Sequence, residues 1–202
     1  MRGSLDALGE LPILPIIRQS SAERALQIAN VFVDAGWPIL EVALTTPGAI
    51  EVIRRLRRER PAVVVGAGTV LTVDMARDAV AADASFLVAP NWSEAVATWT
   101  RDQVVPYLPG VMTPSDVANA VQGGFTVLKL FPAVNLGIEY LRAIAKVFPN
   151  VQFVPTGGIG IADVKAWLSG GAIAAGVGGA FTDGTLEEIR RRAVQALRGW
   201  AG

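Results

Sequence analysis

The sequence predicts an α/β fold, a (β/α)8 TIM barrel that forms a single domain over residues 1–202. Short apolar segments and amphipathic segments alternate about eight times along the chain, which is typical of parallel strands covered by helices. The chain has 202 residues, close to the lower limit of about 200 for this barrel. The first strand is not followed by a glycine-rich dinucleotide loop, which argues against the alternative, an open doubly wound sheet.

Each expected strand is a short apolar run bounded by proline, glycine or polar residues. The expected strands cover residues 11–17, 39–44, 63–67, 86–89, 104–108, 126–131, 151–155 and 172–177. The expected helices start near serine, proline or another capping residue, and several end near glycine. They cover residues 22–34, 47–59, 73–82, 93–101, 114–122, 137–147, 161–168 and 186–198, and a short helix over residues 4–9 precedes the first strand.

The composition limits the classes of partner and chemistry. Lysine plus arginine and aspartate plus glutamate number 18 each, so no net charge attracts nucleic acid or an anionic membrane, and we expect neither as a partner. Residues 1–10 lack the apolar core of a signal peptide, and a cytoplasmic location is expected. The chain has no cysteine and no histidine, which excludes thiolate nucleophiles, serine–histidine triads and most zinc sites. Acid–base chemistry must then use carboxylate, lysine, tyrosine or water.

A lysine inside an apolar strand is the first candidate for chemistry. Alternation along the strand puts Lys129 on the same face as Val127 and Phe131. One interpretation is a strand-end lysine whose side chain reaches solvent. The other is an amine whose pKa is lowered by burial, so that it can attack a carbonyl and form a Schiff base. The rest of the sequence favours the second.

Glu41 is a second lone ionisable residue inside an apolar strand. It is either a structural ion-pair partner or one half of a coupled acid–base pair with Lys129, since both are expected on interior faces. Ala43 and Ala67 are small residues expected on the same faces as Glu41 and Thr69, which would leave room for a ligand.

Several strands end in polar or glycine-rich groups, where the active sites of such barrels gather. Glycine pairs follow the seventh and eighth strands, and backbone N–H groups in those loops suit a phosphate. The alternative is that these glycines only make tight turns with positive φ. The candidates in this set are Arg18, Thr69, Pro90, Thr156, Gly157, Gly158, Gly178 and Gly179.

Six segments, in order along the chain, carry the motifs of a known enzyme family. They cover residues 40–42, 65–70, 87–90, 108–114, 128–132 and 153–159. Together they resemble the 2-keto-3-deoxy-6-phosphogluconate (KDPG) aldolase family of class I pyruvate aldolases, and the similarity extends over nearly the whole chain. The resemblance implies cleavage of a keto-acid sugar phosphate, KDPG, to pyruvate and glyceraldehyde 3-phosphate, by a homotrimer that needs no metal and no cofactor.

The resemblance also implies a role for each candidate. Lys129 matches the Schiff-base lysine and Glu41 the general acid/base. Arg18 matches an arginine that some members carry, and Thr156 favours the gluconate over the galactonate group. Thr69, Pro90 and Phe131 match residues around the pyruvyl moiety, and Gly157 and Gly158 match the phosphate loop.

Two positions depart from the family pattern. Thr45 stands where some relatives have an arginine, and Ala180 follows Gly178-Gly179 where many have a phosphate-binding serine. An aldolase for 4-hydroxy-2-oxoglutarate or for the galactonate epimer is therefore an alternative. A non-catalytic barrel used as an assembly scaffold is another, with interface anchors among Trp37, Trp92, Trp99, Trp167 and Trp200.

Overall fold

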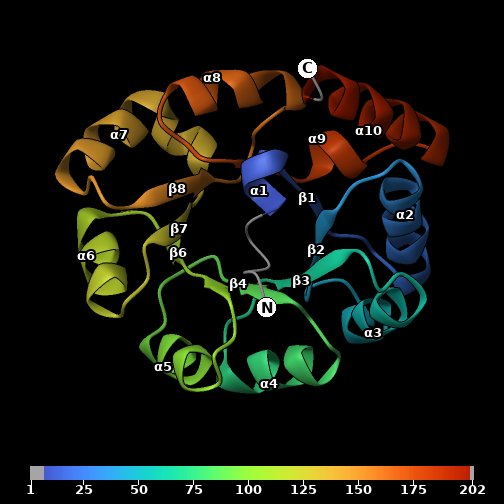
Figure 1. The fold of residues 1–202 in the computed structure, drawn as a ribbon, viewed down its shortest axis with the longest axis horizontal. Coiled ribbons are helices and arrows are strands. Elements are labelled where there is room, and N and C mark those ends of the chain that lie inside the picture. Colours follow the sequence, from blue (N-terminus) through green and yellow to red (C-terminus); the bar gives the residue numbers. More distant parts are fainter. Residues whose placement is uncertain (1–6, 201–202) are drawn as a thin grey trace.

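The computed structural model describes residues 7–200, and in it the strands surround a common centre, with the short helix Ala7–Glu10 over that centre and the longer helices outside the strands (Figure 1). The strands are β1 (Ile13–Ile17), β2 (Ile39–Ala43), β3 (Val64–Gly68), β4 (Phe86–Val88), β5 (Tyr107–Leu108), β6 (Gly110–Val111), β7 (Val127–Leu130), β8 (Gln152–Pro155) and β9 (Ala175–Val177). The α-helices are α1 (Ala7–Glu10), α2 (Ala22–Asp34), α3 (Ala49–Glu59), α4 (Val73–Ala81), α5 (Glu94–Asp102), α6 (Pro114–Gln122), α7 (Ala133–Val147), α8 (Val164–Ser169), α9 (Gly179–Thr182) and α10 (Leu186–Trp200). A 3-10 turn, η1 (Ile161–Asp163), precedes α8.

The expected alternation of strands and helices is confirmed, and the paired strands run parallel. Their hydrogen bonds define two sheets, β5-β4-β3-β2-β1-β9 and β6-β7-β8. The expected strand 104–108 is instead two short strands on either side of Pro109, which has no N–H to donate. The prediction of one continuous sheet of eight strands is not reproduced by these hydrogen bonds, although isolated bridges link Phe153 to Ala172 and Thr156 to Gly176.

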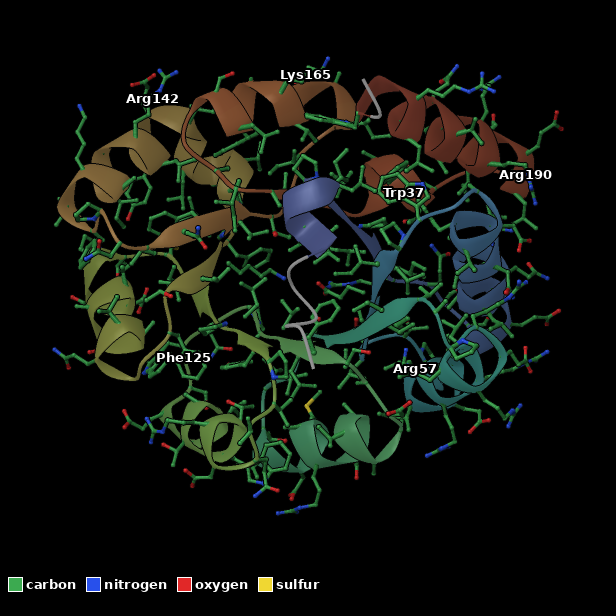
Figure 2. All side chains as sticks on the ribbon, viewed as in Figure 1. Trp37, Arg57, Phe125, Arg142, Lys165 and Arg190 are labelled. Atoms are coloured by element: carbon green, nitrogen blue, oxygen red, sulfur yellow. The ribbon has the colours of Figure 1, made fainter. Side chains whose placement is uncertain are left out.

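Two layers of apolar side chains hold this arrangement together. The outer layer lies between the strands and the helices and includes Trp37, whose ring packs edge-to-face on Phe32 and Phe181. Figure 2 shows Trp37 inside the fold, whereas the charged ends of Arg142, Lys165 and Arg190 point outward. The inner layer is made by alternate residues of the strands and by Leu8 of α1. Its strand members are Leu14, Ile16, Ile39, Phe86, Val88, Leu108 and Val154.

Local signals explain where several helices begin. The Ser21 hydroxyl accepts a hydrogen bond from the N–H of Arg24 at the start of α2. Thr113 and Asp116 form a capping box at the start of α6, where Pro114 fills the first helical position. Both helices begin as the sequence predicts.

Three elements differ from expectation. The helix expected from residue 137 starts at Ala133, because Gly137 (φ 79°) forms a kink within α7 rather than its start. The short helix α9 was not expected, since its Gly-Gly start predicts a turn. The N-terminal helix covers Ala7–Glu10, and residues 4–6 of the expected helix lie outside the described residues. Within residues 7–200, every helix is too short or too polar to cross a bilayer.

Candidate active site

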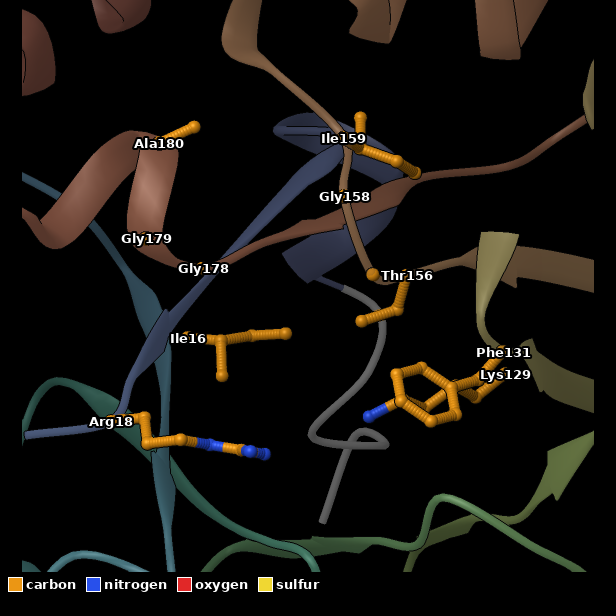
Figure 3. Close-up of a pocket in the computed structure, with 11 residues that line it drawn as sticks. Ile16, Arg18, Lys129, Phe131, Thr156, Gly158, Ile159, Gly178, Gly179 and Ala180 are labelled. Atoms are coloured by element: carbon orange, nitrogen blue, oxygen red, sulfur yellow. The ribbon is translucent and has the colours of Figure 1, made fainter. Parts of the chain in front are cut away.

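A cavity of about 360 Å³ opens among the ends of β1, β7, β8 and β9. Figure 3 shows Lys129, Phe131 and Thr156 on one side of it and Ile16 and Arg18 on the other. In the same view Gly158, in the loop after β8, lies above Thr156, and Gly178 and Gly179, after β9, lie above Ile16. The lining residues are Ile16, Arg18, Lys129, Phe131, Thr156, Gly157, Gly158, Ile159, Gly178, Gly179 and Ala180. Most of the predicted site residues therefore meet at one place, although they come from distant parts of the chain.

Lys129 is buried, with 5% of its surface exposed, so the interpretation as a solvent-reaching lysine is wrong. It lies in the middle of β7, where its Cα is paired with that of Gly110, and its amine points into the cavity (Figure 3). Burial lowers the pKa of the amine, the positive charge of Arg18 lowers it further, and the carboxylate of Glu41 acts in the opposite direction. An amine in this setting gives up its proton more readily than a lysine in water.

Glu41 is 1% exposed and lies on β2. Burial raises the pKa of its carboxyl, while the charges of Lys129 and Arg18 lower it. Its Oε2 atom is buried and has no hydrogen-bond partner in the described part of the chain. No ion pair within 4.0 Å joins Glu41 to Lys129 among residues 7–200. The two groups are coupled through space, and the geometry does not favour the alternative in which Glu41 is a structural ion-pair partner.

Arg18 lines the cavity and its guanidinium donates a hydrogen bond of 3.3 Å to the hydroxyl of Thr69, which is not a lining residue. Thr69 has a positive φ of 62°, a conformation that is uncommon for a β-branched residue and is typical of constrained sites. Both are predicted site residues, and their positions 51 residues apart give no sign of this contact.

Pro90 follows β4 and does not line the cavity. Its backbone instead packs against Gly110, where a Cβ atom would lie 2.3 Å from the Pro90 carbonyl oxygen. Since Gly110 is the partner of Lys129 in the neighbouring strand, Pro90 lies one strand away from the amine.

The loops after β8 and β9 differ in their backbone conformation. Gly157 and Gly158 have positive φ values of 97° and 77°, as the tight-turn interpretation requires, and they also line the cavity. Gly178 and Gly179 line it without a positive φ, because they lead into α9. The Ala180 side chain at this rim was not predicted as a site residue, although its position next to the glycine pair was a usable signal.

The prediction about Ala67 is wrong. Ala67 packs in the outer layer, and Gly66 and Gly68 of β3 face the interior. Counting alternate positions back from Thr69 gave the wrong face, because the positive φ of Thr69 ends the regular alternation of the strand. Gly66 and Gly68, rather than Ala67, are therefore the small residues on the interior face of β3.

Other groups limit what the site can do. Residues 7–200 contain no cluster of three or more histidine, cysteine, aspartate or glutamate side chains that could hold a metal ion.

Among the tryptophans, Trp37 and Trp167 are buried in the core, and Trp92, Trp99 and Trp200 pack partly against it. The core position of Trp37 and Trp167 removes them as candidate interface anchors.

Comparisons with known proteins agree on one family. The family model described as KDPG and KHG aldolase matches residues 5–197. A 2-dehydro-3-deoxy-phosphogluconate aldolase of Pseudomonas aeruginosa is 37% identical over 161 residues, which cover 79% of this chain and 73% of the relative. A KHG/KDPG aldolase of Escherichia coli K12 is 35% identical over 159 residues, which cover 78% of this chain and 75% of the relative.

A solved structure extends the similarity to three dimensions. The KDPG aldolase of Legionella pneumophila has a TM-score of 0.88 and 30% identity, with 96% of this chain and 97% of that chain covered. That crystal structure holds pyruvate captured at low pH as a covalent carbinolamine intermediate.

Proposed function

The chain belongs to the family of KDPG and KHG aldolases, which are carbon–carbon lyases, and we propose that it cleaves KDPG through a Schiff base on Lys129. The observation that carries this assignment is that Lys129 lines the cavity as a buried amine, and that the charge of a second buried group, Glu41, shifts its pKa. A buried amine of lowered pKa is the nucleophile that Schiff-base chemistry needs.

The proposed reaction uses the chain's own side chains. The neutral amine of Lys129 attacks the C2 ketone, and loss of water leaves an iminium ion. The iminium accepts the electron pair of the C3–C4 bond as that bond breaks, while the C4 hydroxyl loses its proton to Glu41, directly or through water. The aldehyde formed is glyceraldehyde 3-phosphate. Glu41 then protonates C3 of the enamine, and hydrolysis of the new iminium releases pyruvate and restores the amine.

The remaining candidates would hold the substrate. Arg18, Thr69, Pro90 and Phe131 are proposed to surround the pyruvyl part, with Thr156 beside them. The phosphate would lie on the backbone of the two glycine loops, at Gly157, Gly158, Gly178 and Gly179. The volume of about 360 Å³ suits a small sugar acid rather than a macromolecule.

The proposed architecture is a closed (β/α)8 barrel in one domain. Lys129 N–H donates to the Pro109 carbonyl, and Ala89 N–H donates to Leu108, so residues 107–111 connect β4 to β7 across the break between the two sheets. The bridges between β8 and the segment of β9 support closure on the other side.

A homotrimer in the cytoplasm is proposed from the family resemblance, and light scattering would test the oligomeric state.

An unphosphorylated 4-hydroxy-2-oxo acid is a second candidate substrate. Ala180 at the cavity rim removes the hydroxyl that many relatives offer to phosphate, and the E. coli relative is named for both substrates. Comparing kcat/KM for KDPG and 4-hydroxy-2-oxoglutarate decides between the two. Equal values would remove the phosphate site from the proposal.

Trapping with pyruvate and borohydride tests the Schiff base directly. The chain has three lysines, Lys129, Lys146 and Lys165, so peptide mass spectrometry can assign the reduced adduct without ambiguity. We expect the adduct on Lys129 alone, together with loss of tryptic cleavage after that residue. An adduct on Lys146 or Lys165 would overturn the proposal, and so would full activity of a Lys129→Ala variant.

A further inference from the structure

The interior face of β3 has no side chains at two successive positions, and two other residues fill the space. Gly66 and Gly68 both face inward and both lie beside large groups. At Gly66 an added Cβ would lie 2.2 Å from the ring of Phe86. At Gly68 the nearest group is the carboxyl of Glu41.

At Gly68, any other residue would force the Glu41 side chain to move. An added Cβ would lie 1.8 Å from Oε1 of Glu41, 2.5 Å from Cδ and 2.8 Å from Cγ. The backbone itself does not require glycine there, because the φ of Gly68 is outside the positive range that favours glycine. The need for glycine at this position therefore comes from the Glu41 side chain alone.

This packing also determines what Glu41 can do. Its carboxyl lies against the β3 backbone at Oε1, and Oε2 is buried with no hydrogen-bond partner within residues 7–200. A buried carboxyl oxygen without a partner is costly unless a ligand or water completes it. The Glu41 carboxyl thus takes its place beside Gly68 by packing, and its buried oxygen can still accept a proton or a hydrogen bond.

We propose that Gly68 is a positioning residue for the aldolase reaction, because the space left by its missing side chain holds the Glu41 carboxyl where it exchanges protons with the substrate bound to Lys129. This inference rests on the proposed function and adds a residue that acts on the substrate only through Glu41. A side chain at position 68 would displace the carboxyl, and proton transfer depends steeply on distance.

A double-mutant cycle tests the inference. Gly68→Ala alone should lower kcat by roughly 10²-fold or more, within the range of about 10²–10⁴ for a general acid–base group. Glu41→Ala removes the carboxyl and opens the space, so adding Gly68→Ala to it should change kcat by less than about 2-fold. The pH dependence of kcat gives a second readout. The inflection assigned to Glu41 should move in Gly68→Ala and be absent in both Glu41→Ala variants.

Gly66→Ala is the matched control, since it crowds Phe86 from the same strand. Its effect on kcat should multiply with that of Glu41→Ala, and it should leave the inflection in place. If Gly68→Ala does not fold, restoration of folding in the Glu41→Ala background supports the inference, and failure to restore it overturns it.

The Glu41→Ala and Gly68→Ala variants separate the role of Glu41 from that of Gly68. If Glu41→Ala keeps full turnover, the proposed role of Glu41 is wrong. If Glu41→Ala is slow while Gly68→Ala is normal, or if the two losses multiply, then only the role of Gly68 is wrong.

Discussion

The amine nitrogen of Lys129 lies 5.3 Å from the centre of the Phe131 ring, on the same face of β7. The ring lies along the side of the cavity from which the amine projects, as Figure 3 shows. Phe131 also packs on the loop after β8, where a Cβ at Gly157 would lie 3.0 Å from the ring. One aromatic side chain thus links the proposed nucleophile to the proposed phosphate loop.

Replacing Lys129 by methionine keeps most of its apolar volume and removes the amine. Turnover and the borohydride-trapped adduct should both disappear. The variant should also unfold at a higher temperature near neutral pH, because a buried amine with a lowered pKa must be charged in the unfolded chain. The gain should shrink as pH rises toward the unfolded pKa of 10.5. Thermal melts over a pH series measure it, and a lower melting temperature at every pH would contradict the expectation.

Replacing Glu41 by glutamine keeps the shape and removes the titrating group. We expect kcat to fall by roughly 10²–10⁴-fold. The acidic limb of the wild-type rate profile should have its inflection above 4.5, since burial raises the pKa of Glu41, and the glutamine variant should lack it. A loss of less than about 10-fold would leave Glu41 with a structural role.

Glu41→Gln should also change how the stability of the fold depends on pH. The folded-state pKa of Glu41 is raised, so its contribution to stability is present below pH 4.5 and is lost as pH rises through the folded-state pKa. Glutamine does not titrate. The variant should therefore gain stability over the wild type as pH rises above 4.5, and denaturant unfolding at three pH values would show whether it does.

Ala180→Ser should restore a hydroxyl at the rim of the cavity, next to Gly178 and Gly179. One added hydrogen bond contributes about 0.5–1.5 kcal/mol, which corresponds to roughly 2- to 10-fold in kcat/KM for the phosphorylated substrate. The unphosphorylated analogue serves as the internal control and should not change. An equal gain for both substrates would show that the serine does not act on phosphate.

Tyr107→Phe tests a buried group outside the site. The phenol of Tyr107 has no hydrogen-bond partner in the described part of the chain, and burial raises its pKa. Removing an unsatisfied hydroxyl should stabilise the fold by about 1 kcal/mol. Tyr140→Phe is the control, because that hydroxyl donates to the Met112 carbonyl at 2.5 Å and its loss should destabilise. Urea unfolding of both variants gives the comparison.

The sequence predicts the strands and helices well where apolar periodicity and capping residues agree, as at α2 and α6. It fails where a single backbone conformation overrides the pattern. The kink at Gly137 and the positive φ of Thr69 each shift an assignment that alternation alone would make. Local sequence also gives no view of hydrogen bonding between distant strands, so the break at Pro109 was not predicted.

The predicted site residues are brought together to a large extent because the ends of parallel strands meet at one edge. The contacts that these residues make with one another could not be predicted from the sequence. The hydrogen bond from Arg18 to Thr69 and the packing of Glu41 on Gly68 join residues 51 and 27 positions apart, and no spacing rule covers them. Both contacts required the three-dimensional arrangement of β1, β2 and β3.

Helix α1 comes just before β1 and contributes Leu8 to the inner apolar layer, which fills the centre of the molecule below the cavity. Substrate and products must then enter and leave at the opposite end. In the proposed reaction pyruvate stays bound to the Lys129 amine while the aldehyde leaves first. In the synthetic direction, pyruvate must arrive before its partner.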